Sequence, residues 1–416
     1  MTTAKPYVIA KSEVWAAWKQ VKANRGAAGV DRESIAAYEA KLEDNLYKVW
    51  NRMSSGSYFP PPVRQVAIPK RDGRTRMLGV PTVADRIAQT VVKRFLEPLL
   101  EPIFHADSYG YRPGRSALQA VGTCQRRCWR QDWVIDLDIA AFFDTLDHAL
   151  LLKAVQYHTS ERWVVLYIER WLVAPMQTAE GTLEARTSGS PQGSAISPLL
   201  ANLYLHYAFD AWMTRTHPQV QFERYCDDIV VHCASRYEAE ALLEQISARL
   251  AECRLTVNRE KTRIVYCQDD RRGGGHRPRS FDFLGYTFRA RPCKDRRSGK
   301  SFLGFNPAIS EAAKTRLGQE IRQWGLHRRS DLSLTDLAQR INPVVRGWIA
   351  YYGRYFPSVV RPLLERINVY LMRWAQRTYK RLQGHPQRAW RFLASVATRE
   401  PDLFAHWKHG VQPRAG

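Results

Sequence analysis

The feature that most constrains this chain is a pair of acids set between two apolar, β-rich runs in the segment FERYCDDIVVHC, residues 222–233. Aromatic and β-branched residues favour strands, so the two runs predict a hairpin with Cys226, Asp227 and Asp228 at its turn. Carboxylates at the end of a buried hairpin are costly unless a cation neutralises them. The segment therefore predicts a sheet that holds a charged site at its edge.

A second strand is predicted at WVIDLDI, residues 133–139, where apolar and acidic residues alternate. The alternation places Asp136 and Asp138 together on one face. Carboxylates that converge from two adjacent strands are the arrangement that holds two Mg²⁺ ions about 4 Å apart for nucleotidyl transfer. On spacing alone, Asp136 and Asp138 are both candidates for the third ligand. The similar pair Asp269-Asp270 lies in a polar loop without flanking strands, so we assign it no catalytic role.

The charge of the chain indicates a polyanionic partner. Its 416 residues include 63 Lys and Arg against 40 Asp and Glu, a net charge of +23. Residues 291–416 carry 24 basic and 8 acidic side chains, so about a third of the chain holds +16 of this excess. Such an excess favours nucleic acid through phosphate neutralisation, although a basic protein of another kind remains possible on charge alone.

The composition also bears on the compartment. No run of about 18 apolar residues is present, so no membrane-spanning helix is expected. The N-terminus, MTTAKPYVIAKSEVW, lacks the pattern of a secretory signal, and we expect an intracellular protein. The seven cysteines match no paired zinc pattern and are expected to be reduced and mostly buried.

The remaining sequence predicts an α+β fold followed by helices. Asp72-Gly73 indicates a hairpin turn, and apolar residues spaced by four in Ile87, Val91, Phe95 and Leu99 indicate one helix face. Asp144 and Asp147 are expected to cap a following helix. The expected helices lie at 11–55 with a break at 26–29, 83–101, 161–175, 196–213, 236–253 and from 310 onward; the expected strands lie at 222–225, 229–233 and 262–266, with a hairpin at 281–288.

The order of eight sequence blocks carries a family resemblance. They are VAIPKRDGRTRMLGVP with Lys70, TVADRIAQ with Arg86, SYGYRPGRSALQAV, DLDIAAFFD, SGSPQGSAISPLLANLYL, RYCDDIVVHC, LTVNREKTRIV and FDFLGYTF. Together they resemble bacterial group II intron-encoded reverse transcriptase/maturases, from about residue 29 to residue 406. The resemblance implies a right-hand polymerase followed by an all-α thumb/maturase domain. The expected parts are an N-terminal helical extension of the fingers (1–60), fingers and palm (61–300), and thumb/maturase (301–416).

The resemblance also implies a role for each matching residue. Asp138, rather than Asp136, would join Asp227, Asp228 and the carbonyl of Ile139 as ligands of two Mg²⁺ ions. Phe143 would be the steric gate that excludes a ribose 2′-hydroxyl. The other implied contacts are Lys70 and Arg86 with the triphosphate, Gln192 with the nucleotide and template, Phe283, Leu284 and Gly285 with the primer end, and Arg112 and Arg115 with the template. For the last two arginines, a structural role in a surface loop stays open.

The C-terminal third resembles the maturase segment of the same family at INPVVRGWIAYYGRYFPS, residues 341–358. In the next predicted helix, Arg366, Arg373, Arg377 and Lys380 form a basic stripe suited to structured RNA. Most tryptophans of this region are expected in its core. No cysteine follows Cys293, so the chain resembles the subtype without an HNH endonuclease.

The expected partners are intron RNA, an RNA template with a DNA primer, deoxynucleoside triphosphates and target DNA, in the bacterial cytoplasm and at the nucleoid. Two departures from the family pattern are Cys226, where Ala is commonest, and Ala140-Ala141, where Lys-Gly is frequent. Two alternatives stay open: a splicing cofactor with a vestigial polymerase, and a domesticated reverse transcriptase in defence or repair. The oligomeric state is not predicted.

Overall fold

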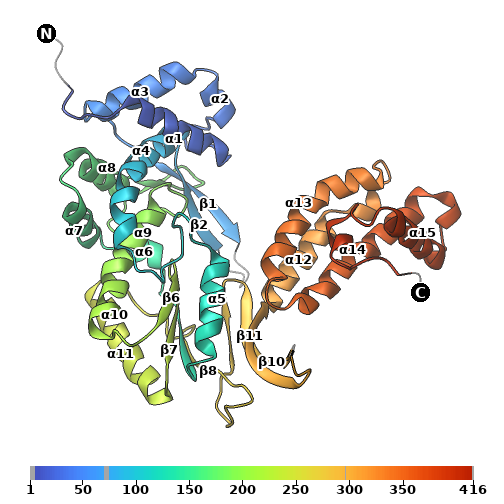
Figure 1. Cartoon of the computed structure of the whole chain (residues 1–416). Coiled ribbons are helices and arrows are strands. Elements are labelled where there is room, and N and C mark those ends of the chain that lie inside the picture. Colours follow the sequence, from blue (N-terminus) through green and yellow to red (C-terminus); the bar gives the residue numbers. More distant parts are fainter. Residues whose placement is uncertain (1–4, 70–74, 296, 415–416) are drawn as a thin grey trace. The chain divides into compact units, whose positions relative to one another are not determined.

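The computed structural model describes residues 5–69, 75–295 and 297–414 (Figure 1). The chain divides into two compact units. The first comprises Met1–Ala120 and Ile135–Ile264, and the second comprises Val121–Val134 and Val265–Gly416. The chain passes from one unit to the other within helix α5 (Ala117–Cys128) and strands β3 (Trp133–Leu137) and β8 (Arg263–Tyr266).

The first unit combines helices with two small sheets. Its helices are α1 (Lys11–Ala23), α2 (Ile35–Glu39), α3 (Leu42–Ser54), α4 (Val83–Leu100), the 3-10 turn η1 (Glu101–Ile103), α6 (Phe142–Thr145), α7 (His148–His158), α8 (Arg162–Val173), α9 (Ser197–Leu205), the π-helical turn η2 (His206–Asp210), α10 (Ala211–Thr216) and α11 (Arg236–Glu252). Its other strands are β1 (Val63–Pro69), β2 (Thr75–Val80), β4 (Met176–Gln177), β5 (Leu183–Glu184), β6 (Phe222–Tyr225) and β7 (Asp228–Cys233).

The order of strands positions the acidic residues. One sheet runs β2-β1-β4-β5, and the other runs β6-β7-β3-β8. The predicted strand pair on either side of Asp72-Gly73 is confirmed as β1 and β2, which are antiparallel, while the turn itself lies outside the described residues. In the second sheet β3 lies beside β7, so the strand that carries Asp136 and the end that carries Asp138 lie next to the acidic hairpin.

Helix α4 is buried on almost all sides, which differs from the single predicted stripe. Ile87 and Val91 are buried as expected, but Leu99 is 44 % exposed and Leu100 is buried in its place. The reason is geometric: an α-helix has 3.6 residues per turn, so a strict spacing of four rotates away from the core after a few turns. Thr82 caps the helix by accepting a hydrogen bond from Asp85 N.

The long apolar helix predicted at 196–213 is interrupted. It begins as α9, widens into the π-helical turn η2, and continues as α10. The apolar residues from Leu199 to Leu205, together with Phe209, are buried, so the apolar character of the segment was interpreted correctly. The π-turn had no signal in the residue pattern.

The second unit places a three-stranded sheet before a group of helices. The sheet order is β11-β10-β9, with β9 (Ser280–Phe283), β10 (Tyr286–Lys294) and β11 (Ser301–Ile309). The helices are α12 (Glu311–Gln323), the 3-10 turn η3 (Leu326–Arg328), α13 (Leu334–Tyr352), α14 (Pro357–Thr378), the 3-10 turn η4 (Lys380–Leu382), α15 (Pro386–Arg399) and α16 (Ala405–Lys408). The predicted α+β pattern with helices after residue 310 is thus confirmed. In the described residues, none of the helices is long and apolar enough to cross a membrane.

Helix α14 contributes an apolar stripe to the core of the second unit. Its predicted apolar stripe, Leu363, Leu364, Ile367, Tyr370, Leu371 and Trp374, is buried throughout. Burial of each large apolar side chain stabilises a fold by about 1.5–3 kcal/mol. The predicted core role of the tryptophans holds for Trp348, Trp374 and Trp407, which are at most 8 % exposed.

Candidate active site

The hairpin β6–β7 holds the acidic pair at its end, as predicted. Tyr225 pairs with Asp228, and Cys226 and Asp227 form the two-residue connection between the strands. We call residues 225–228 the acidic turn. The strands on either side are buried, whereas Asp228 is exposed. Cys226 has φ 58°, in the left-handed region that residues with a Cβ rarely adopt. A strained backbone at this point must be held by its surroundings.

Asp138 follows the end of β3, the strand that lies beside β7 of the acidic hairpin. Its backbone is fixed by two hydrogen bonds to the segment after α11: Asp138 N donates to Thr262 Oγ1 at 3.2 Å, and Asn258 N donates to Asp138 O at 2.8 Å. The ammonium of Lys261 lies 3.4 Å from the Asp138 carboxylate. Ile139 forms a bridge with Val257, which fixes the backbone whose carbonyl is the predicted additional ligand.

The electrostatics of Asp228 link the three carboxylates. Partial desolvation of the carboxylate by the surrounding protein raises the pKa of Asp228 from 3.8 to about 7, and the negative charges of Asp227 and Asp138 add to this rise. Lys261 acts in the opposite direction. The Asp228 side chain also keeps contact with solvent. The carboxylates of Asp138, Asp227 and Asp228 therefore lie close enough to repel one another. Oxygen donors gathered in this way suit a hard divalent cation such as Mg²⁺, which would relieve the repulsion.

Phe143 and the loop that carries Gln192 pack against each other in the first unit. Ser190 N donates to Phe143 O at 2.7 Å, and a Cβ on Gly189 would lie 2.8 Å from the same oxygen. The loop that carries Gln192 therefore packs closely on α6, where Phe143 is buried. Gln192 lines a cavity of about 380 Å³ that also includes Asp144. The predicted steric gate and the predicted nucleotide contact are thus near neighbours.

Two predicted triphosphate contacts have different outcomes in the structure. Lys70 lies outside the described residues. Arg86 is 9 % exposed, and its Nη2 donates to Ala27 O at 2.6 Å. Burial lowers the pKa of Arg86, against the opposing effect of Asp31 and Asp85. In this structure the guanidinium supports the backbone before α2, so its role toward a triphosphate stays a prediction.

The two predicted template contacts also differ. Arg112 is buried and uses its guanidinium within the fold: Nε and Nη2 donate to Glu101, and Nη1 donates to His105 O and Ser108 O at 2.6 and 2.7 Å. This geometry favours the structural alternative for Arg112. Arg115 is exposed and lies over the ring of Tyr109, 5.8 Å from its centre. A template contact stays a prediction for both residues.

The look-alike pair Asp269-Asp270 is held by the fold of the second unit. Asp269 Oδ1 accepts from Arg271 N at 2.9 Å, and Asp270 Oδ2 accepts from Leu303 N at 2.6 Å. Their carboxylates therefore fix a loop to β11, in line with the absence of a predicted catalytic role. Asp147 caps α7 through Leu150 N, as predicted, whereas Asp144 lies within α6.

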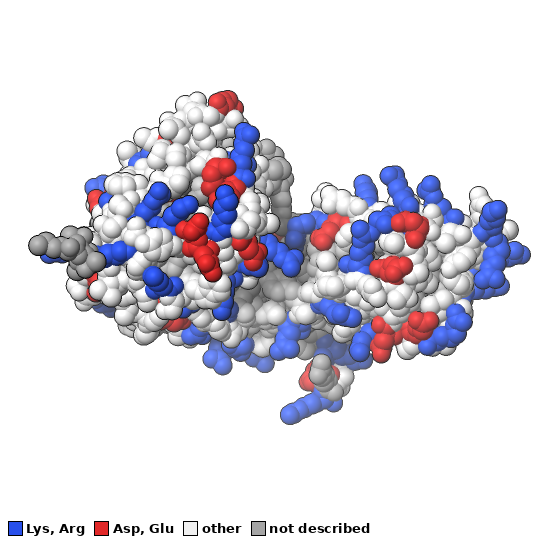
Figure 2. Space-filling view, turned by 90° about the horizontal axis from the view of Figure 1, so that it is seen from above, with Lys and Arg blue, Asp and Glu red and all other residues white. Residues whose placement is uncertain are grey.

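The other predicted contacts lie in the second unit. Phe283 ends β9, and Leu284 and Gly285 form a two-residue turn with φ 51° and 81°, the signature of a tight hairpin. Arg366, Arg373, Arg377 and Lys380 are all exposed. The predicted single helix is wrong at its end: α14 stops at Thr378, Tyr379 is extended, and Lys380 begins the 3-10 turn η4, so only the three arginines share one helix. Figure 2 shows Lys and Arg side chains spread widely over the visible surface. These residues are accessible to RNA, and their contacts stay predictions.

Sequence reasoning left three further residues of the site without a role. Lys261 lies within the block LTVNREKTRIV, yet a single lysine in a sequence does not indicate where its ammonium points. Asn202 and Asp210 were interpreted only as parts of an apolar helix, although a polar residue inside such a helix is a usable signal of a buried network. Both lie directly behind the acidic turn.

Comparison with known families agrees with this geometry. Residues 68–288 match the family described as Reverse transcriptase (RNA-dependent DNA polymerase), and residues 314–392 match Group II intron, maturase-specific domain. The first match alone covers 221 of the 416 residues. The chain belongs to the group II intron reverse transcriptase/maturase family. The predicted family, the order of a reverse transcriptase domain before a helical maturase domain, and the polymerase class are thereby confirmed.

The relatives of this chain differ in how much of their length is matched. Protein YkfC of Escherichia coli strain K12 is 32 % identical over 286 residues, which is 60 % of this chain and 75 % of YkfC. Group II intron-encoded protein LtrA of Lactococcus lactis subsp. cremoris is 32 % identical over 208 residues, 48 % of this chain and 33 % of LtrA. Nuclear intron maturase 4, mitochondrial, of Arabidopsis thaliana is 24 % identical over 199 residues, 48 % of this chain and 24 % of that protein. The chain thus aligns with most of YkfC but with about a third of LtrA.

Proposed function

We propose that this chain is an RNA-directed DNA polymerase encoded by a group II intron, which binds its intron RNA, assists splicing and copies the RNA into DNA during intron mobility. The observation that carries the polymerase part is the position of Asp138 at the end of β3, beside the β6–β7 hairpin that holds Asp227 and Asp228. The negative charges of Asp227 and Asp138, which add to the raised pKa of Asp228, support the grouping of these three carboxylates. The splicing part rests on the maturase-specific domain at residues 314–392 and on the name of the relative LtrA.

The proposed chemistry assigns roles to the chain's own residues. Asp138, Asp227, Asp228 and the Ile139 carbonyl would hold two Mg²⁺ ions, since all are hard oxygen donors. Such ions, when bound, lower the pKa of an attacking 3′-hydroxyl and stabilise the charge on the triphosphate and the departing pyrophosphate. Phe143 would lie under the sugar and exclude a 2′-hydroxyl.

Further contacts with the nucleotide and the nucleic acid are proposed. Lys70 and Arg86 would stabilise the triphosphate, and Gln192 would lie against the nucleotide and template pair. Phe283, Leu284 and Gly285 would support the primer end. Charge at the phosphates matters because negative charge shifts to the leaving group as the bond breaks.

The proposed RNA partner fits the surface of α14. Arg366, Arg373 and Arg377 are exposed on α14 beside its buried apolar stripe, and exposed Lys380 follows in η4, so all four side chains are accessible to a partner. Contacts of this kind neutralise phosphates and make binding steeply salt-dependent. We further propose that target DNA is the second nucleic-acid partner and that the protein acts in the bacterial cytoplasm and at the nucleoid.

Primer extension tests the polymerase proposal. The parent chain, an RNA template, a DNA primer, deoxynucleoside triphosphates and Mg²⁺ should give extension that is lost in the double variant Asp227→Asn/Asp228→Asn. The matched control is Asp269→Asn/Asp270→Asn, which changes the same dipeptide in the second unit and should extend at the parent rate. Equal extension by the parent and the Asp227→Asn/Asp228→Asn variant would contradict the assignment.

A splicing assay separates the two proposed activities. The same Asp227→Asn/Asp228→Asn variant should still bind intron RNA and stimulate its splicing, because the variant leaves the helical maturase domain unchanged. Loss of splicing in that variant, with its fold intact, would show that the two activities share one site.

A further inference from the structure

A fully buried ion pair lies directly behind the acidic turn. The side chains of Arg224 and Asp210 are both 0 % exposed. Arg224 Nε donates to Asp210 Oδ1 at 2.7 Å, and Nη2 donates to Oδ2 at 2.5 Å, so the pair is bidentate. Removing two charges from water is costly, and apolar residues of similar volume often stabilise a fold equally well. The stability of the fold therefore does not by itself explain this pair.

The remaining arm of Arg224 reaches the turn itself. Its Nη1 donates to Cys226 O at 3.1 Å and to Asn202 Oδ1 at 3.0 Å. Cys226 O belongs to the peptide group that joins Cys226 to Asp227. The hydrogen bond therefore fixes the orientation of the peptide from which the Asp227 carboxylate extends. Because Cys226 has φ 58°, this backbone needs such support.

The neighbours of Arg224 make this support rigid. Asn202 Nδ2 donates to Gly110 O at 2.7 Å, and a Cβ on Gly110 would lie only 2.5 Å from Cys226 N. The backbone of Arg224 is held on the other side, since its N donates to Asp107 O at 2.9 Å and its O accepts from Tyr109 N at 2.8 Å. The turn is thus enclosed by close backbone contacts and one guanidinium.

The π-helical turn supplies the acid of the pair. Asp210 is the last residue of η2 (His206–Asp210), between α9 and α10. A π-turn accommodates one extra residue and rotates everything after it relative to a regular α-helix, and such turns recur at functional sites. The irregularity of this helix and the placement of Asp210 against Arg224 therefore have a common explanation.

We propose that Arg224 is a positioning residue for DNA synthesis. It holds the Cys226–Asp227 peptide so that the carboxylates of the acidic turn face the proposed metals, and it touches neither the substrate nor a metal. Asp210 and Asn202 keep the guanidinium in this orientation. The inference rests on the proposed function, because it assumes that Asp227 and Asp228 act in catalysis.

Steady-state kinetics of primer extension test this role with two variants. In Arg224→Met/Asp210→Leu the charges are replaced together by apolar side chains, which preserves the fold but removes the hydrogen bond to Cys226 O. We expect kcat to fall about 100-fold, since a small misplacement of a reacting group costs about this factor. KM for the nucleotide and Kd for template-primer should change less than about twofold, because Arg224 contacts neither. Arg224→Lys keeps the positive charge but lacks the planar, multiply donating guanidinium. Its kcat should lie between that of the parent and that of Arg224→Met/Asp210→Leu.

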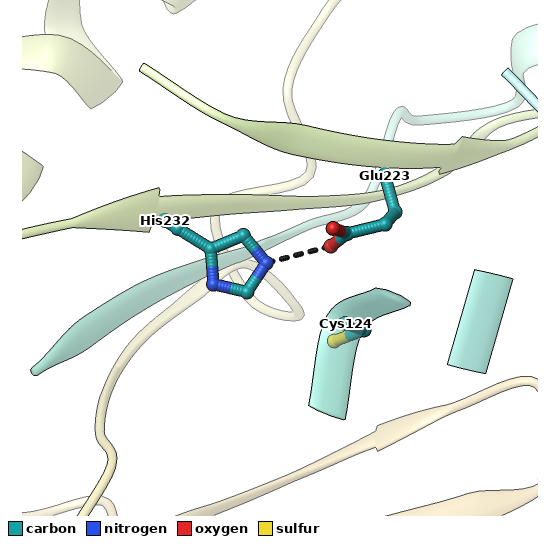
Figure 3. Close-up of side chains that lie close together, drawn as sticks. All are labelled: Cys124, Glu223 and His232. Carbon is teal, nitrogen blue, oxygen red and sulfur yellow. Dashed lines mark hydrogen bonds and ion pairs between the residues drawn. The ribbon is translucent and has the colours of Figure 1, made fainter. Parts of the chain in front are cut away.

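The same hairpin offers a matched control. Glu223 and His232 form another fully buried polar pair, joined by a hydrogen bond of 2.6 Å across β6 and β7 (Figure 3). Glu223 precedes Arg224 and so points to the opposite face of β6. Glu223→Gln perturbs a buried pair of the hairpin without removing the bond to the turn, and it should keep kcat within about twofold of the parent.

The outcomes are distinguishable. A folded Arg224→Met/Asp210→Leu variant with the parent kcat overturns the positioning role, and so does an equal loss of kcat in Glu223→Gln, which would indicate a general loosening of the hairpin. If the double variant melts far below the parent, Arg224→Lys decides the question at a temperature where it is folded. A parent that shows no Mg²⁺-dependent extension instead defeats the proposed function.

Discussion

Asp85→Asn should change how the stability of the protein depends on pH. The Asp85 carboxylate is buried in the first turn of α4 and is surrounded by neutral donors. Trp171 Nε1 and the Tyr58 hydroxyl donate to Oδ1 at 2.7 and 3.0 Å, and Gln89 Nε2 donates to Oδ2 at 2.9 Å. Burial raises the pKa of Asp85 from 3.8 to about 6, although these hydrogen bonds and Arg86 lower it.

The size and sign of the effect follow from this shift. A difference of about two pKa units between the unfolded and folded states corresponds to roughly 3 kcal/mol. Because the folded pKa is the higher one, ionisation favours the unfolded state. The contribution of Asp85 is fully present below about pH 4 and is lost as the pH rises through about 6. Roughly half of the loss, about 1.4 kcal/mol, falls between about pH 5 and pH 8.

Thermal denaturation of the parent and Asp85→Asn at about pH 5 and pH 8 measures this difference. Asparagine cannot ionise, and its amide facing Gln89 adds a penalty that does not depend on pH. Relative to the parent, the variant should therefore be more stable at the higher pH than at the lower by about 1.4 kcal/mol, or about 2–3 °C in Tm for a transition of this size. The exposed substitution Asp44→Asn should run parallel to the parent. Parallel profiles for Asp85→Asn itself would refute the reasoning.

Three further predictions concern catalysis and RNA. Phe143→Ala should admit ribonucleotides, measured by incorporation of each nucleotide type; an unchanged preference for deoxynucleotides contradicts the gate. Arg373→Ala/Arg377→Ala should weaken RNA binding and lower the slope of log K against log salt by about two, whereas exposed Arg236→Ala should leave both unchanged. Lys261→Met removes the ammonium that lowers the pKa of Asp228, so the acid limb of the pH–rate profile should move to higher pH; a fixed limb argues against the coupling.

Local patterns predicted most of the elements because their causes are local. The hairpin at the acidic turn and the tight turn at Leu284-Gly285 follow from residue type and spacing over a few positions. The π-turn at His206–Asp210 could not be predicted in this way. Its last residue, Asp210, pairs with Arg224, which lies 14 residues further along the chain and on another element, so the contact that accompanies the turn is not local.

The site was predictable in its acids but not in its supports. Alternation places Asp136 and Asp138 on one face and cannot separate them, so the choice of Asp138 rests on the family resemblance and stays a prediction. The backbone of Asp138 is held by Asn258 and Thr262, which are distant in sequence. Arg112 shows a similar limit. A guanidinium that binds backbone carbonyls and a carboxylate has the same donors as one that binds phosphates, so only the fold distinguishes the two.

The contrast between the two aspartate pairs shows what the fold provides for catalysis. Asp270 accepts a hydrogen bond from Leu303 N, which commits its carboxylate to the structure. Within the described part of the chain, the Asp228 carboxylate accepts no hydrogen bond from a backbone or side-chain donor, and its pKa is raised first by desolvation and then by the charges of Asp227 and Asp138. Arg224 instead supports the turn through Cys226 O, a backbone atom. The fold thus fixes the backbone of the acidic turn and leaves carboxylate oxygens available, which is the condition a site for divalent cations requires.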